Sequence, residues 1–240
     1  MRKIPAQLMD REFFSRKEYI HAMKTEYGLT IPQIDYDLRK RIADGTVTRI
    51  GNNQYAVCVN QKRQVYLHTY SQSAMEIVQV IHQEYENLEF QVFELTQLND
   101  FMNHLVAHNT IFVFVENDLV DHVFATLRQT FSGRVLLKPS ELEYYRYLQD
   151  DEIIVCRLPS ETPKGYKQPW QSKLEKILVD ISTDKLISRI VPSGEKREIY
   201  TGAFSDYYIN TDVMLRYARR KGADKKMQKI LNEYLGAAER

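Results

Sequence analysis

Residues 14–59 read FSRKEYIHAMKTEYGLTIPQIDYDLRKRIADGTVTRIGNNQYAVCV, and this stretch decides the fold. It begins with Ser15 followed three residues later by Glu18, a spacing typical of a capping box at the start of a helix. Gly28 fits the position just past the helix, where a left-handed backbone favours glycine. Apolar side chains recur between them at helical spacing and predict one buried stripe, made of Tyr19, Ile20, Met23 and Tyr27.

A second helix is expected directly after the Gly28 turn. Thr30 and Gln33 form another capping-box pair, and Pro32 falls in the first turn, where its missing N–H costs nothing. Gly45 is expected to end the helix. The stripe expected to be buried is Ile31, Ile34, Leu38 and Ile42. At about 100° per residue, the opposite face carries Gln33, Tyr36 and Lys40, flanked by Asp37 and Arg39.

After Gly45 the pattern changes from helix to strand. Residues 46–50 alternate between polar and apolar, Gly-Asn-Asn at 51–53 turns the chain, and residues 54–59 return, which predicts a hairpin. Two short helices followed by a hairpin are typical of a winged helix-turn-helix. We therefore predict such a DNA-binding domain over residues 1–62, with residues 1–13 as a short lead-in helix packed beneath it.

In a winged helix-turn-helix the second helix enters the major groove, and basic and hydroxyl groups around it contact phosphates. Gln33, Tyr36 and Lys40 are expected to face base edges. Lys17, Arg39, Arg49 and Asn52 are expected to face phosphates. The full set of expected DNA-binding residues is Lys17, Thr30, Gln33, Tyr36, Arg39, Lys40, Arg49 and Asn52. The alternative is that the domain packs against protein, or is a former DNA-binding domain with a structural role.

Composition limits the remaining possibilities. The chain has 240 residues, 43% of them hydrophobic, and a net charge of +1, so any basic surface must arise by local clustering. The two cysteines, Cys58 and Cys156, lie in apolar runs without metal-type spacing and are expected to be buried free thiols. The N-terminus lacks the apolar segment of a secretory signal, and no run is long enough to span a membrane. A soluble, cytoplasmic protein without membrane partners is expected.

Residues 65–240 alternate between helix and strand patterns, which predicts an α/β (α+β) domain with a central sheet and a helical C-terminal tail. The polar, basic linker at residues 60–64 marks the expected boundary. Residues 110–115, TIFVFV, are typical of a strand buried on both faces. Ser73 is expected to cap a helix that runs to about Tyr85, with Met75, Ile77, Val78 and Ile81 as its apolar residues. Further helices are expected at 97–108, 118–131, 140–148, 172–182, 202–210, 211–221 and 224–235, and further strands at 88–94, 134–137 and 152–158.

Basic residues are concentrated near the C-terminus. They are Arg216, Arg219, Arg220, Lys221, Lys225, Lys226 and Lys229. One interpretation is a solvated helix face. The other is an electrostatic contact, either with DNA phosphates beside the N-terminal domain or with an acidic partner protein.

The sequence contains few residue patterns that are typical of catalytic sites. Glu116, Asp118 and Asp121 follow an apolar strand and could hold magnesium, but a helix N-terminus also favours acidic residues and explains them without chemistry. His104 and His108 are four residues apart without an intervening acid, which is more typical of a surface pair than of metal ligands. No phosphate-binding loop or nucleophile motif occurs. We therefore predict no enzymatic activity, no cofactor and no metal.

Four segments carry a family resemblance. They are FSRKEY, RIADGTVTRIGNNQYAV, KLEKILVDI and YARRKGADKKMQKIL, and the most specific parts are residues 45–55 and 174–180. In this order the chain resembles the AbiEi-type antitoxins of bacterial type IV toxin–antitoxin and abortive-infection systems. The resemblance implies a repressor that binds inverted repeats in its own promoter. It also implies a nucleotidyltransferase-like toxin as partner, counteracted by the C-terminal region, and leaves an oligomer possible.

Three hypotheses stand at this point. The first is an antitoxin-like transcriptional regulator. The second is a DNA-binding regulator whose α/β domain senses a ligand or partner and which has no toxin. The third is an enzyme, a nuclease or nucleotidyltransferase relative that a winged helix targets to DNA.

Overall fold

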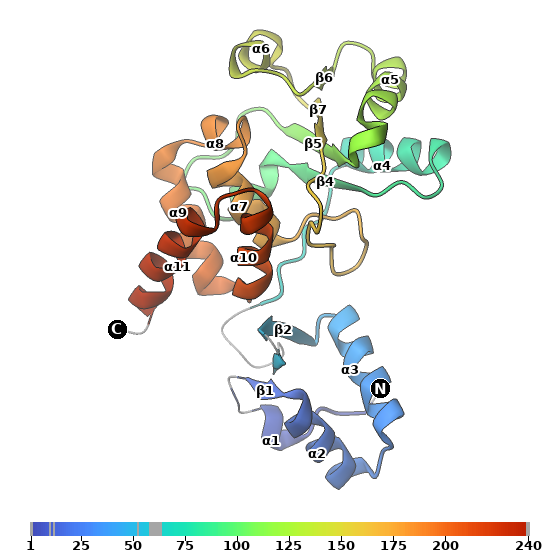
Figure 1. Ribbon diagram of the computed structural model, residues 1–240, viewed down its shortest axis with the longest axis vertical. Helices are drawn as coiled ribbons and strands as arrows, with labels where there is room; N and C mark the ends of the chain where they lie inside the picture. The colour runs from blue at the N-terminus through green and yellow to red at the C-terminus, as the bar shows by residue number, and fades with distance from the viewer. Residues whose placement is uncertain (1, 10, 12, 52, 58–63, 239–240) are drawn as a thin grey trace.

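The computed structural model describes residues 2–9, 11, 13–51, 53–57 and 64–238. Within this part of the chain, helices are combined with two sheets, one of three strands and one of four, which confirms the expected α/β (α+β) class. Figure 1 shows the described residues between 2 and 57, which we call the N-terminal module, at one end of the molecule and the four-stranded sheet with its helices at the other.

The N-terminal module contains the two helices and the hairpin expected from the sequence. Among the described residues, the lead-in helix expected over residues 1–13 covers only Ala6–Met9, and the short strand Phe14–Ser15 was not predicted. The elements of the module are α1 (Ala6–Met9), β1 (Phe14–Ser15), α2 (Arg16–Tyr27), α3 (Ile31–Ala43), β2 (Val47–Gly51) and β3 (Gln54–Val57). β2 and β3 form an antiparallel hairpin, and β1 pairs with the other edge of β3. The lead-in helix α1 buries Leu8 in the same hydrophobic cluster as Phe14, Tyr19 and Ile34. This cluster contains only residues of the module.

Both predicted capping boxes are present. Ser15 accepts a hydrogen bond from the Glu18 backbone, Gln33 accepts one from the Thr30 backbone, and Gly28 ends α2 with a left-handed φ of 62°. The predicted stripe of α3 is wrong at one position, because Ile31 is exposed. Near the other end of the helix, Arg41 is buried beside Ile34 and Leu38 on the inner side.

Arg41 can be buried because its charge is paired. Its Nε donates to Asp37 over 2.5 Å, the Tyr19 hydroxyl donates to the same carboxylate over 2.6 Å, and a guanidinium nitrogen donates to the Arg2 carbonyl. Arg16 on α2 holds Asp35 through two hydrogen bonds. These contacts hold α3 against the rest of the module and leave its opposite face in solvent.

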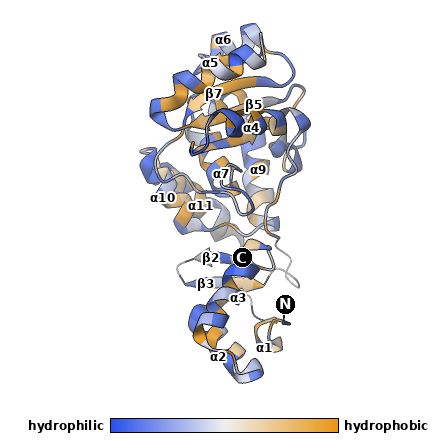
Figure 2. Ribbon diagram, turned by 90° about the vertical axis from the view of Figure 1, so that its right-hand side faces the viewer, coloured by the Kyte–Doolittle hydropathy of each residue, from blue (hydrophilic) through white to orange (hydrophobic). Residues whose placement is uncertain are grey.

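The larger sheet is built from β4 (Phe90–Glu94), β5 (Thr110–Val115), β6 (Val135–Leu137) and β7 (Glu152–Arg157). Its order is β4-β5-β7-β6, with β4 antiparallel to β5 and the other neighbours parallel. All six residues of β5 are buried, which confirms the prediction for this strand. In Figure 2, β5 and β7 are among the most apolar segments of the molecule.

Helices cover both faces of this sheet. On one face, α4 (Gln72–Glu84) and α5 (Val120–Thr130) pack against side chains such as Val92, Val113 and Val155. On the other, Phe93, Phe112 and Phe114 contact a cluster built largely from the C-terminal helices. The elements on this side are α6 (Glu141–Tyr147), α7 (Leu174–Thr183), α8 (Ile187–Ile190), α9 (Ser193–Asp206), α10 (Thr211–Arg220) and α11 (Asp224–Ala238).

The sequence did not predict a buried charge cluster beneath α10. Asp180 on α7 is fully buried and accepts hydrogen bonds from Lys176 (2.7 Å), Lys221 (2.6 Å) and the Tyr217 hydroxyl (3.0 Å). The Lys176 ammonium also lies 3.4 Å from the ring centroid of Phe114. Burial would raise the pKa of Asp180, but the two lysines hold it below its ordinary value. The cluster joins α7, α10 and the sheet.

The prediction of a helix at residues 97–108 is wrong. Only a short 3-10 helix, η1 (Leu95–Asp100), forms, and the chain then continues irregularly to β5. Side chains bind the backbone instead: Asn99 accepts from the Val106 N–H, and Asn109 accepts from Thr96. Such local side-chain hydrogen bonds compete with helix formation.

Smaller corrections concern helix boundaries. Ser71, not Ser73, caps α4, and Met75 on that helix is exposed. α8 was not predicted, and α9 begins nine residues before the expected residue 202. Cys58 lies outside the described residues. Cys156 is half-buried rather than fully buried, and burial raises the pKa of its thiol to about 12. No helix in the described ranges is long and apolar enough to cross a membrane.

Candidate nucleic-acid interface

The face of α3 opposite its buried stripe lies in solvent. Tyr36 is 68% exposed, and Gln33 and Lys40 are exposed beside it, one helical turn away on either side. Ile34, Leu38 and Arg41 hold the other side of the helix in the module. An aromatic ring, an amide and an ammonium group are therefore available to a ligand on one helix face.

Two of the predicted DNA-binding residues also have a local role. The Thr30 hydroxyl and backbone N–H each donate to Gln33 Oε1 over 3.0 Å. This capping box occupies the amide oxygen of Gln33 and leaves its NH₂ group directed elsewhere. Gln33 can therefore donate to a ligand while it caps α3.

The remaining predicted residues lie on different surfaces. Lys17 lines a hollow beside α1, together with Arg11 and His21, and no residue of α3 lines this hollow. Arg39 and Arg49 lie together in a separate cleft. Asn52 lies outside the described residues. The structure thus brings together two of the four expected phosphate-binding residues and separates Lys17 from them.

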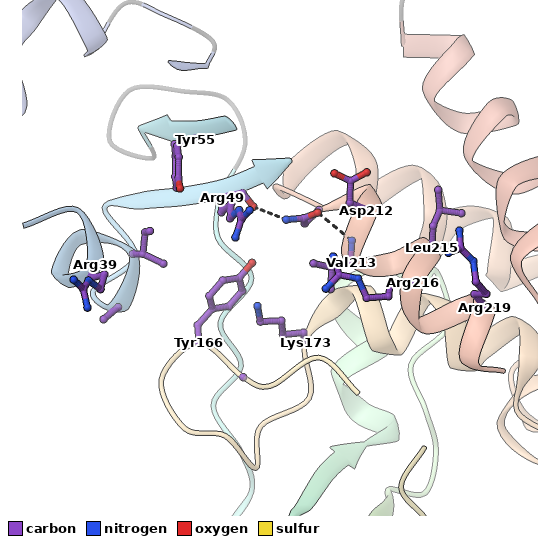
Figure 3. Close-up of a pocket in the computed structure, with 14 residues that line it drawn as sticks. Arg39, Arg49, Tyr55, Tyr166, Lys173, Asp212, Val213, Leu215, Arg216 and Arg219 are labelled. Carbon is purple, nitrogen blue, oxygen red and sulfur yellow. Dashed lines mark hydrogen bonds between the residues drawn. The ribbon is translucent and has the colours of Figure 1, made fainter. Parts of the chain in front are cut away.

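The cleft that holds Arg39 and Arg49 has a volume of about 1000 Å³ and lies between the N-terminal module and α10 (Figure 3). One wall is formed by α3 and β2 with these two arginines. The opposite wall carries Arg216 and Arg219 of α10, and Lys173 lies just before α7. Five cationic side chains therefore line the cleft, against one acidic residue, Asp212. This is a strong local imbalance in a chain of net charge +1.

Aromatic rings lie among these cations. The Lys173 ammonium is 4.1 Å from the ring centroid of Tyr166, which Figure 3 shows between the two walls. Burial lowers the pKa of Lys173, while the nearby Glu175 carboxylate acts in the opposite direction. Tyr55 of β3 also lines the cleft and stacks on Phe14 inside the module. The cleft can therefore bind anions through charge and contact flat groups through tyrosine.

Asn210 connects the two walls. Its side-chain NH₂ donates to the Arg49 carbonyl over 3.2 Å, and its Oδ1 caps α10 by accepting from the Val213 N–H. Its backbone N–H donates to the buried Glu175 carboxylate over 3.0 Å. One residue thus contacts β2, α7 and the start of α10.

Sequence reasoning identified part of this cleft. Arg216 and Arg219 belong to the basic C-terminal run, and both line the cleft. The neighbouring Arg220 pairs with Glu161, and Lys221 turns inward to Asp180. Sequence reasoning missed Tyr55, Tyr166, Lys173, Asn210 and Asp212. Their spacing along the chain carries no signal, because they meet only through the fold.

The acidic and histidine candidates do not assemble into a site. Glu116, Asp118 and Asp121 are exposed, and no group of three or more metal-binding side chains gathers in the parts of the chain that the structure describes. The helix that would have paired His104 with His108 is absent. His104 contacts Glu195 and His108 contacts Asp150 instead.

The fold and the cleft define a class of protein. It is an α+β protein in which a small module of helices and a hairpin packs beside a larger region of sheet and helices, with a basic cleft between them. Residues 33–237 match the model of a family of unknown function, DUF6577, and the chain belongs to this family. The matched region begins within α3 and includes every residue that lines the cleft. No match is found among curated proteins or among solved structures.

Proposed function

We propose that this protein is a DNA-binding transcriptional regulator whose N-terminal module is a winged helix-turn-helix. The observation that carries the proposal is the exposed face of α3. Tyr36 and Lys40 point away from the module core on a helix that a capped turn joins to α2 and that a hairpin follows. An α-helix fits the major groove of B-DNA, where lysine and amide side chains distinguish base edges.

The basic residues next to α3 support the same proposal. Arg39 lies on α3 and Arg49 on β2, the strand that follows it. A duplex lying against the exposed face of α3 brings its sugar–phosphate backbone toward these side chains. Arginine binds phosphate through its planar fork of donors, so these contacts would add affinity without reading sequence.

The proposal is tested by substituting Lys40, whose exposed side chain makes no hydrogen bond or ion pair in the described region. Lys40→Ala is expected to weaken binding to the DNA upstream of the protein's own gene by about tenfold in a gel-shift titration, with a smaller effect on random duplex. Lys185→Ala is the matched control, because Lys185 is also exposed but lies in the loop between α7 and α8. Equal promoter affinity for Lys40→Ala and wild type would count against α3 as the reading helix.

The resemblance to AbiEi-type antitoxins supports a narrower version of this function. The protein then acts in the cytoplasm, represses its own operon at inverted repeats, and counteracts a nucleotidyltransferase-like toxin without being an enzyme itself. Co-expression with the product of a neighbouring nucleotidyltransferase-like gene tests it. Growth arrest by that product, relieved by the full chain, is the expected result; arrest that the chain does not relieve would refute the antitoxin role and leave DNA binding in place.

A further inference from the structure

We propose that the cleft between the N-terminal module and α10 is a phosphate-binding site whose ligand contacts both walls at once. The ligand is a phosphate group, supplied either by a DNA backbone or by a small phosphorylated molecule. The proposal goes beyond the proposed function, because it requires no reading of bases by α3.

The charges of the cleft carry the first step. Arg39 and Arg49 on one wall face a second group of cations on the other, with Asp212 as the one acidic residue among the lining side chains. Like charges across a cleft repel each other, and an anion between them converts this repulsion into attraction. The arrangement is therefore stabilised by a multivalent anion.

The second step concerns the partners of the α10 arginines. Within the described residues, the guanidinium groups of Arg216 and Arg219 make no hydrogen bond or ion pair, whereas the adjacent Arg220 pairs with Glu161. Both side chains are exposed and line the cleft. Their donors remain available, in the planar geometry that matches phosphate oxygens.

Size and shape favour a phosphate chain over an intact duplex inside the cleft. A volume of about 1000 Å³ falls at the upper end of the range for small-ligand sites. It can hold a nucleotide-sized ligand or one strand of backbone that enters from the adjacent face of α3. Because the two walls belong to segments far apart in the sequence, a bridging phosphate links the module to the C-terminal helices.

The test is a calorimetric titration of the full-length protein with sodium triphosphate at constant ionic strength. Arg39→Ala removes a cation from the module wall and Arg216→Ala removes one from the α10 wall. Each is expected to lower affinity by about tenfold, because each removes charged hydrogen bonds to the anion. Arg146→Ala is the control, since Arg146 is an exposed arginine on α6, at the far end of the molecule in Figure 1. Its affinity is expected to equal that of wild type.

Competition with a short random-sequence duplex distinguishes the two sources of phosphate. If the duplex displaces triphosphate and Arg216→Ala weakens duplex binding, the cleft takes the DNA backbone. If triphosphate and duplex bind together, the site takes a small phosphorylated ligand. Should triphosphate fail to bind wild type while duplex binding still depends on both Arg39 and Arg216, the backbone is again the ligand.

Three results would overturn the inference. One is that neither triphosphate nor duplex binding depends on Arg216. Another is that only one of the two substitutions, Arg39→Ala or Arg216→Ala, lowers the affinity. The third is that Arg146→Ala loses as much affinity as Arg216→Ala. Failure of the DNA-reading proposal can be distinguished from failure of the phosphate site, because Lys40→Ala tests DNA reading without changing a residue that lines the cleft. A protein that binds triphosphate through both walls but no DNA keeps the phosphate site and loses the regulator function.

Discussion

At the scale of single residues, the least expected feature is the amount of charge that the chain buries. Lys176 and Asp180 on α7 are fully buried, and Arg41 on α3 is almost so. The periodicity of residues 172–182 predicts the apolar side of that helix, with Leu174, Ile177, Leu178 and Ile181. It cannot predict that the polar side is also covered, because two of the partners of Asp180, Tyr217 and Lys221, come from a distant part of the chain.

Removing the charge of Asp180 is expected to destabilise the protein. In Asp180→Asn, Lys176 remains buried with its counter-ion gone, and losing one partner of a buried pair costs about 3–5 kcal/mol. The free energy of unfolding, measured by urea titration at neutral pH, is expected to fall by roughly the lower end of that range. Asp206→Asn is a matched control at an exposed site. A loss below about 1 kcal/mol for Asp180→Asn would show that the cluster is not held by charge.

Acid is expected to destabilise the protein partly through Glu94. Burial alone would raise the pKa of Glu94, but hydrogen bonds from His68, Ser71 and Asn109 lower it below its ordinary value of 4.5. A carboxylate whose folded pKa is lowered stabilises the fold above the unfolded pKa. Its contribution to stability is lost as the pH falls through the pKa of the carboxylate in the folded state.

Unfolding free energies measured from about pH 7 to about pH 3 should therefore decline less steeply for Glu94→Gln than for wild type over the acid part of the series. Glu86→Gln, at an exposed position, should leave the wild-type slope unchanged. Identical slopes for Glu94→Gln and wild type would mean that Glu94 does not contribute to acid unfolding.

At the scale of elements, capping boxes predicted helix starts correctly, whereas the single serine at Ser73 did not. The pairs Ser15 with Glu18 and Ser140 with Glu143 both begin helices where expected. These motifs are reliable because donor and acceptor lie within four residues of each other. Residues 97–108 show the opposite case: their apolar spacing fits a helix, but asparagines and the distant Glu195 bind the backbone instead. A contact across so many residues leaves no local pattern.

Two glycines are expected to respond to the same substitution with opposite signs. Gly28 has a left-handed φ of 62°, so Gly28→Ala strains the backbone and is expected to lower stability by about 1 kcal/mol. Gly194 lies in the first turn of α9, and a Cβ there meets no atom within 4 Å. Gly194→Ala is expected to raise stability by up to about 1 kcal/mol. Urea titration of both variants checks the pair; a stability of Gly28→Ala equal to or above that of wild type would contradict the assignment of strain to Gly28.

At the scale of the whole molecule, the candidate site is divided between distant parts of the chain. The exposed face of α3 could be predicted, because Gln33, Tyr36 and Lys40 follow from helical spacing alone. The cleft could not, because Arg49 and Asn210 are 161 residues apart and meet only through the tertiary fold. Local patterns contain no information about such a contact.

Asn210 offers a way to loosen the N-terminal module without unfolding α10. Serine also caps helices well, so Asn210→Ser is expected to preserve the start of α10 while losing the reach to the Arg49 carbonyl. Hydrogen–deuterium exchange should then rise in peptides covering β2 and stay unchanged in peptides covering α10. Asn210→Ala, which removes both contacts, is expected to raise exchange in both. Unchanged exchange in β2 for both variants would show that this hydrogen bond does not hold the module.

The two sides of helix α10 face different surroundings: one packs against the core and the other lines the cleft. Tyr217 on α10 and Lys221 just past its end point into the core and hold Asp180, while Arg216 and Arg219 project into the cleft. The spacing between the projecting arginines is therefore as rigid as the packing behind them. Anyone who redesigns the protein for a differently shaped anion would have to rebuild the interior beneath α10 as well as its surface.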